Sequence, residues 1–131
     1  MKVKITSMRT EGSGMLVDFS CAAGNGAAFW KSKRITPVAG KEYDAELDIA
    51  LVLQVGENAE ETAGVTPGFE LVGQDVQIMG ISEQIDDDGI VYLRLSRDCI
   101  VVIESSGAPP KVGQMLRMVV KSGLLRLTAF S

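Results

Sequence analysis

One short segment combines aromatic and basic side chains in a pattern suited to nucleic acid. It holds the chain's single tryptophan and its densest basic cluster: Phe29, Trp30, Lys31, Lys33 and Arg34. On a β-strand alternate side chains point to opposite faces, so Phe29, Lys31 and Lys33 would share one face. Aromatic rings stack on unpaired bases while cations meet phosphates, which predicts a surface for single-stranded DNA or RNA. The competing interpretation places one ring in the core and leaves the lysines solvated.

Four carboxylates alternate with apolar residues in the next strand-like stretch. They are Glu42, Asp44, Glu46 and Asp48. An extended chain rises about 3.3 Å per residue, so neighbours in this row lie roughly 7 Å apart, too far to grip one small cation. The row suits a basic protein partner. Lys2 and Lys4 on an adjacent first strand would instead neutralise it through ordinary cross-strand pairs, and the sequence leaves both interpretations open.

Groups for catalysis or metal binding are scarce. The chain has no histidine, which excludes Ser-His-Asp and Cys-His nucleophilic arrangements and most catalytic zinc sites. Cys21 and Cys99 each lie in an apolar run, which favours buried free thiols. The stretch 86–89, Asp-Asp-Asp-Gly, has Arg97 where a calcium loop needs Glu, and it indicates a hairpin turn. We therefore expect no enzyme, no metal, no cofactor and no small-molecule substrate.

Composition and charge indicate an ordinary folded chain with an uneven charge distribution. Its 131 residues are 46% hydrophobic, and the formal net charge is −4. Residues 1–40 carry six basic against two acidic side chains, and residues 41–75 carry one against nine. The overall acidity disfavours bulk attraction to nucleic acid. No run approaches the ~20 apolar residues of a membrane helix, and the start lacks a secretory signal, so we expect a cytoplasmic location and no membrane partner.

Period-two alternation dominates the sequence, and Gly-rich turn signals separate the strand-like runs. The sequence also resembles itself at a spacing of 73 residues. Val3–Ile5 matches Val76–Ile78, and a later Pro-x-x-Gly turn, Pro37–Gly40, matches Pro110–Gly113. Two matches in the same order and at the same spacing predict an internal duplication.

These patterns predict an all-β protein of two tandem five-stranded barrels, OB-like or SH3-like in strand number and length. The first barrel would span residues 1–55 and the second 69–131, with an acidic linker at 56–68. A single fused β-barrel or sandwich is the alternative. The expected function is a non-catalytic binding module, an intracellular adaptor or inhibitor of another protein whose basic residues match the carboxylate row. The alternative is a single-stranded nucleic-acid-binding protein that uses the aromatic and basic segment.

Overall fold

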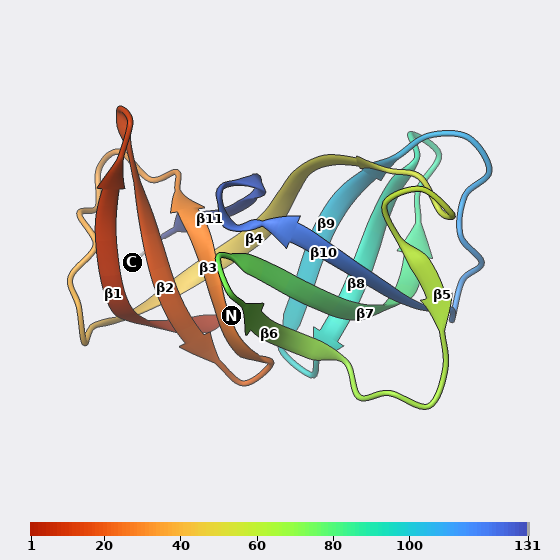
Figure 1. Ribbon diagram of the computed structural model, residues 1–131, viewed down its shortest axis with the longest axis horizontal. Coiled ribbons are helices and arrows are strands. Elements are labelled where there is room, and N and C mark those ends of the chain that lie inside the picture. Colours follow the sequence, from red (N-terminus) through yellow and green to blue (C-terminus); the bar gives the residue numbers. More distant parts are fainter. Residues whose placement is uncertain (131) are drawn as a thin grey trace.

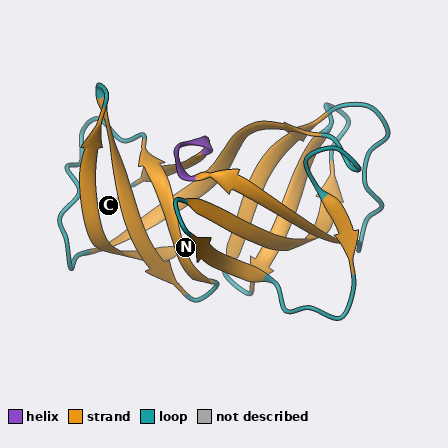
Figure 2. Ribbon diagram, viewed as in Figure 1, coloured by secondary structure: helices purple, strands orange, loops and turns teal. Residues whose placement is uncertain are grey.

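The computed structural model describes residues 1–130 and confirms the all-β class (Figure 1, Figure 2). The strands are β1 (Lys2–Glu11), β2 (Gly14–Cys21), β3 (Gly24–Trp30), β4 (Glu42–Leu53), β5 (Glu60–Thr62), β6 (Gly68–Val72), β7 (Asp75–Ile85), β8 (Ile90–Ser96), β9 (Cys99–Ser105), β10 (Met115–Lys121) and β11 (Leu125–Ala129). A single 3-10 turn, η1 (Ser122–Leu124), separates the last two strands. Within the described residues, no helix has the length and apolar character needed to cross a bilayer.

Eight strands close into a barrel through hydrogen-bonded ladders. The order around the ring is β1, β2, β3, β6, β7, β8, β9, β4 and back to β1. β11 lies between β3 and β4, while β10 pairs with β7 and β5 pairs with β10. The contact between β3 and β6 is narrow, since it consists of the single pair Gly24 and Phe69.

The two separate barrels expected at 1–55 and 69–131 are not confirmed, because strands from the two parts of the chain interleave in one sheet. Figure 1 shows two lobes that share β4. The first lobe comprises β1, β2, β3, the start of β4, and β11 from the far end of the chain. The second comprises β5 to β10 together with the end of β4, which runs parallel to β9. This arrangement lies closer to the single fused barrel, and the internal duplication stays a prediction.

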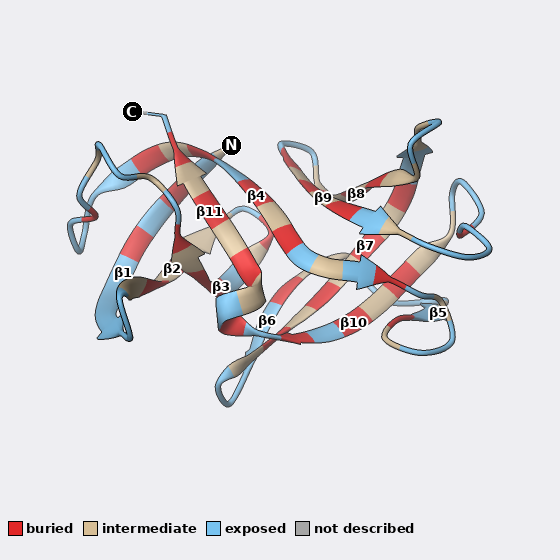
Figure 3. Ribbon diagram, turned by 90° about the horizontal axis from the view of Figure 1, so that it is seen from above, coloured by how far each residue is buried: buried red, intermediate tan, exposed pale blue. Residues whose placement is uncertain are grey.

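Alternating residues of the long strands fill the hydrophobic core. In β4 the apolar residues Tyr43, Ala45, Leu47 and Ile49 are buried, and the carboxylates between them face outward. The alternation is visible in Figure 3 as bands of colour along β4. The period-two interpretation of this stretch is therefore confirmed, and it fixes which face of β4 is available for function.

The stretch 56–68, expected to be a linker, contains ordered contacts. It includes β5, which pairs with the start of β10. It also includes Asn58, whose Oδ1 accepts a hydrogen bond from the Gln54 N–H at 2.9 Å and whose Nδ2 donates to the Val52 carbonyl at 2.8 Å. This side chain satisfies main-chain groups at an edge of β4 where no strand is paired.

The two lobes also meet backbone to backbone where β3 and β6 begin. The Phe69 N–H donates to the Ala23 carbonyl at 2.8 Å, and the Phe69 ring meets Phe19 edge-on with centroids 5.6 Å apart. A Cβ on Gly24 would lie 2.3 Å from the Phe69 carbonyl oxygen, and one on Gly68 would lie 2.5 Å from that of Ala23. Both glycines have positive φ, 124° and 153°. Only glycine fits these two positions.

Candidate functional site

The structure divides the aromatic and basic segment between a strand and a loop. β3 ends at Trp30, so the alternation expected to continue through the basic residues stops there, which corrects the strand interpretation. The Lys31 N–H still donates to the Leu127 carbonyl at 2.8 Å. At the next residue a side chain replaces the main chain in contacting β11. The Ser32 hydroxyl donates a hydrogen bond to the Ala129 carbonyl at 3.0 Å and accepts one from the Ala129 N–H at 2.6 Å. Beyond the strand, the basic side chains are exposed: Lys31, Lys33 and Arg34.

Trp30 belongs to the core of the first lobe. Its side chain is 7% exposed and meets Tyr43 edge-on, with ring centroids 5.2 Å apart. Its indole N–H donates to the Ile35 carbonyl at 2.8 Å. The Tyr43 hydroxyl accepts from the Val38 N–H and donates to the Thr36 carbonyl, so both rings hold the loop after β3. Because the Trp30 ring is buried against Tyr43, it offers no face on which a base can stack.

Phe29 lies on the outer face of the first lobe and is half-buried. Its ring covers Gly14, where an added Cβ would lie 2.1 Å from Phe29 Cε2. A shallow hollow of about 410 Å³ beside it is lined by Phe29, Lys31 and Lys33 among others. The structure thus leaves Phe29 half-buried beside the two lysines, whereas Trp30, which also lines the hollow, is almost fully buried.

The carboxylate row lies on the outer face of β4, beside β1. Lys2 pairs in register with Asp44, and Lys4 pairs with Glu42. The Lys2 ammonium lies 3.0 Å from Asp44 Oδ1, so the cross-strand interpretation is confirmed for this pair. Exposed pairs of this kind add little stability.

Asp48 forms ion pairs with two cations. Arg126 on β11 donates from Nε to Asp48 Oδ1 at 2.6 Å, and the Lys31 ammonium lies 3.5 Å from Oδ2. Asp48 is therefore neutralised by two cations. Glu42 and Glu46 form no ion pair within residues 1–130. Two carboxylates of the row, Asp44 and Asp48, are therefore in ion pairs, and the other two are not.

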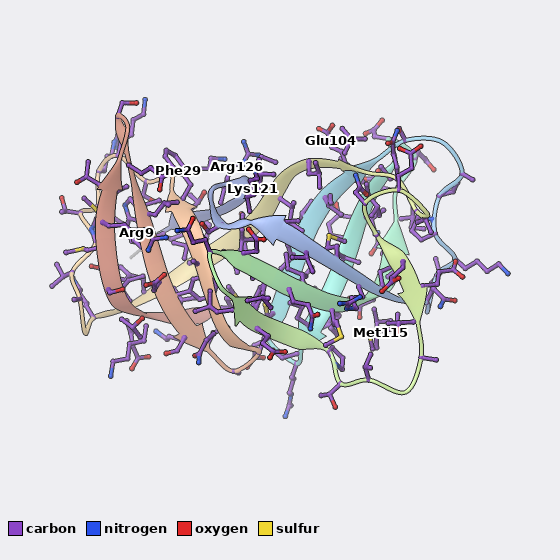
Figure 4. The ribbon with its side chains drawn as sticks, viewed as in Figure 1. Arg9, Phe29, Glu104, Met115, Lys121 and Arg126 are labelled. Atoms are coloured by element: carbon purple, nitrogen blue, oxygen red, sulfur yellow. The ribbon has the colours of Figure 1, made fainter. Side chains whose placement is uncertain are left out.

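Two hollows lie end to end on the outer face of β11, β4, β9 and β8. Their volumes are about 600 Å³ and about 640 Å³, and both are lined by Asp48 and Val102. These two residues are register partners in the parallel β4–β9 ladder, so the hollows meet at that pair. We call the combined feature the β4 groove. The strands that form it, β11, β4, β9 and β8, are seen from above in Figure 3, and Figure 4 shows Arg126 and Glu104 on this side of the molecule.

The β4 groove combines an apolar floor with charged ends. Tyr92, Ile100 and Val102 are half-buried and line this outer face. Glu46 lines one hollow together with Arg94 and Arg97, and Glu104 lines the other together with Arg126; neither Glu46 nor Glu104 forms an ion pair with a described residue. A surface with this lining can hold an extended chain that carries apolar and basic side chains.

Sequence reasoning missed the contribution of β9 to this site. Residues 99–103, Cys-Ile-Val-Val-Ile, are apolar without interruption, so both faces of the strand are apolar. The inner face fills the core through Val101 and Ile103, while Ile100 and Val102 remain on the outside. An uninterrupted apolar strand next to an alternating one was the available signal.

The two cysteines, each expected to be a buried free thiol, are both free, but only Cys99 is fully buried. A hydrogen bond from the Cys99 thiol lowers the pKa of Cys21 to about 7; burial opposes this shift, and the N–H groups of Ala23 and Gly24 support it. The same contact, followed by burial, raises the pKa of Cys99. Cys21 is half-exposed, whereas Cys99 is 2% exposed.

No family model, no curated protein and no solved structure matches this chain. Its function therefore has to be inferred from the surfaces described above.

Proposed function

We propose that the protein is a non-catalytic binding module whose β4 groove holds an extended segment of another protein. The observation that carries this proposal is the apolar floor of the groove, which is half-buried on the outside of a barrel whose core is already filled. Apolar side chains gathered in an open groove favour a partner that covers them. In this role the protein would act as an adaptor or an inhibitor of the segment it binds.

The dimensions and charges of the groove define the kind of segment. Six residue steps separate Glu46 from Val52 along β4, which corresponds to roughly 20 Å at about 3.3 Å per residue. An extended segment of about six residues spans that length. Its apolar side chains would contact Tyr92, Ile100 and Val102, and a basic side chain at each end would meet Glu46 and Glu104.

A labelled peptide of alternating valine and lysine, eight residues long, is a suitable probe for fluorescence anisotropy. Val102→Asp removes part of the apolar floor, and Glu46→Lys reverses one charged end. Each change is expected to weaken peptide binding about tenfold, which corresponds to 1.4 kcal/mol. Glu57→Lys is the matched control, because it makes the same charge change on an exposed residue outside the β4 groove. Equal affinities of Glu46→Lys, Val102→Asp and Glu57→Lys would contradict the proposal.

The second candidate is single-stranded nucleic-acid binding, and it is favoured by the position of Phe29 beside Lys31 and Lys33. Here Phe29, without Trp30, is the stacking ring. Phe29→Ala and Lys33→Glu should each weaken binding of a short oligonucleotide, and affinity should fall steeply with salt. Emission from the buried Trp30 should stay at short wavelength throughout the titration. Absence of binding at low salt would reject this candidate.

A further inference from the structure

Cys21 and Cys99 lie at the ends of two hairpins from different lobes. Cys21 ends β2 and pairs with Gly24 across the β2–β3 hairpin. Cys99 begins β9 and pairs with Ser96 across the β8–β9 hairpin. The two hairpin turns lie side by side at the lower edge of Figure 1, and the thiols are close enough for Cys99 to lower the pKa of Cys21. Two residues 78 positions apart in sequence are thus brought to neighbouring hairpin ends.

We propose that Cys21 and Cys99 form a reversible redox pair, in which oxidation by a hydroperoxide joins the two lobes through a disulfide. The geometry assigns different roles to the two sulfur atoms. Cys21 is half-exposed, and the N–H groups of Ala23 and Gly24 help to lower its pKa, so its thiolate is accessible to an oxidant. Cys99 is 2% exposed and takes the role of the resolving thiol.

The chemistry proceeds in two steps. The Cys21 thiolate attacks the terminal oxygen of the hydroperoxide, forms a sulfenic acid and releases an alkoxide, or hydroxide when the oxidant is hydrogen peroxide. The Cys99 sulfur then attacks the Cys21 sulfur, the S–S bond forms, and hydroxide leaves and takes up the Cys99 proton as water. The two thiols lose two electrons and the hydroperoxide gains them. A dithiol reductant reverses the reaction by thiol–disulfide exchange.

The crosslink would act where the two lobes have few main-chain contacts. The β3–β6 ladder contains only the pair Gly24 and Phe69, and Gly24 is the cross-strand partner of Cys21. A disulfide requires the sulfur atoms to approach to about 2.05 Å, so the hairpin ends would be held together beside this narrow contact. Oxidation is therefore expected to prevent the lobes from separating there.

The test compares reduced protein with protein treated with hydrogen peroxide. Intact mass spectrometry should show a monomer about 2 Da lighter, and a proteolytic digest should contain the Cys21 and Cys99 peptides linked. Closing a loop of this length should raise the Tm by on the order of 10 °C, and dithiothreitol should restore the original value. The alkylation rate of Cys21 in the reduced protein should be half-maximal near pH 7.

The Cys99→Ala variant separates this proposal from general oxidation. Cys21 should then stop at the sulfenic acid, which dimedone traps, and the increase in Tm should disappear. Cys21→Ser should leave Cys99 unreactive towards hydrogen peroxide. A treated wild-type protein that shows only added oxygen or disulfide-linked dimers, without the lighter monomer, would overturn the proposal. None of these results depends on the partner of the β4 groove.

Discussion

The two lobes protect their strand edges in different ways. In the first lobe β1, β2, β3, β11 and β4 form a closed cycle in which each strand is paired on both sides. In the second lobe the strands run from β4 through β9, β8, β7 and β10 to β5, and within residues 1–130 no ladder joins β10 back to β4. At that edge the Asn58 side chain bonds the main chain of β4. One lobe is thus closed by a strand, whereas at the open edge of the other the Asn58 side chain bonds main-chain groups of its own segment.

The two lobes also differ in their aromatic packing. The first lobe buries Trp30 against Tyr43, and both rings also anchor the loop after β3. The buried residues of the second lobe are mostly aliphatic, and Phe69 packs against Phe19 of the first lobe. We therefore expect substitutions in the first lobe and at the junction to cost more free energy of unfolding than those at the open edge of the second.

The largest effect is expected from Trp30→Ala. Removing a buried ring leaves a cavity, and the variant should lose about 3–5 kcal/mol in the free energy of unfolding, measured by urea denaturation. Phe29→Ala is the matched control, since its neighbouring ring lies on the outer face and should cost much less. Equal losses for the two variants would contradict the assignment of Trp30 to the core.

The next effect concerns the junction between the lobes. Gly24→Ala places a Cβ 2.3 Å from the Phe69 carbonyl oxygen at a φ of 124°, so we expect a loss of about 2–3 kcal/mol. Gly12→Ala is the control: its φ is also positive, at 60°, but an added Cβ meets nothing within 4 Å. That variant should lose about 1 kcal/mol. If thermal unfolding shows no difference between the two, the close backbone contact is not important for stability.

At the open edge of the second lobe, Asn58→Ala removes two hydrogen bonds to β4. The freed main-chain groups can bond to water because this region is exposed, so the expected loss is about 1 kcal/mol. Hydrogen exchange at the Gln54 amide should also become faster. Asn25→Ala, at an exposed asparagine with no side-chain hydrogen bond to residues 1–130, should leave both quantities unchanged. An unaltered Gln54 exchange rate in Asn58→Ala would show that Asn58 does not protect the edge.

The smallest effect is expected on the surface of the second lobe. Arg94 donates two hydrogen bonds to the Glu83 carboxylate, at 2.7 and 2.9 Å, and these bonds lower the pKa of Glu83. The folded-state pKa lies below the unfolded value, so the pair stabilises the fold above the unfolded pKa. That contribution is lost as the pH falls through the folded pKa. Glu83→Gln should therefore be slightly less stable than wild type at neutral pH and equally stable in acid. Denaturant midpoints at the two pH values measure this difference. A difference that persists in acid would show that the substitution acts through packing and not through the charge of Glu83.

The pattern of buried and exposed residues could be predicted from the sequence, because period-two alternation determines which side chains face the core. The outward carboxylates of β4 follow from this alternation. The partner of each strand could not be predicted in the same way. β11 pairs with β3 and β4 across long sequence separations, and alternation alone does not select a distant partner.

The candidate sites also depend on contacts between distant segments, which the sequence pattern does not reveal. Trp30 and Phe29 are adjacent in the sequence, and only the fold determines which of the two rings enters the core. The β4 groove depends on β9 lying beside β4, so its lining was not visible in either segment alone. The neighbouring positions of Cys21 and Cys99 likewise require two hairpins from different lobes to meet.

The position of β11 has a consequence for the order of events during synthesis. β3 and β4 are made early, but the strand that lies between them ends at Ala129. Until residues 125–129 leave the ribosome, the facing edges of β3 and β4 have no main-chain partner. Such edges are open to pairing with other nascent chains. The first lobe therefore completes its folding only after synthesis of β11, and its many non-local pairings favour slow folding and a need for protection by chaperones.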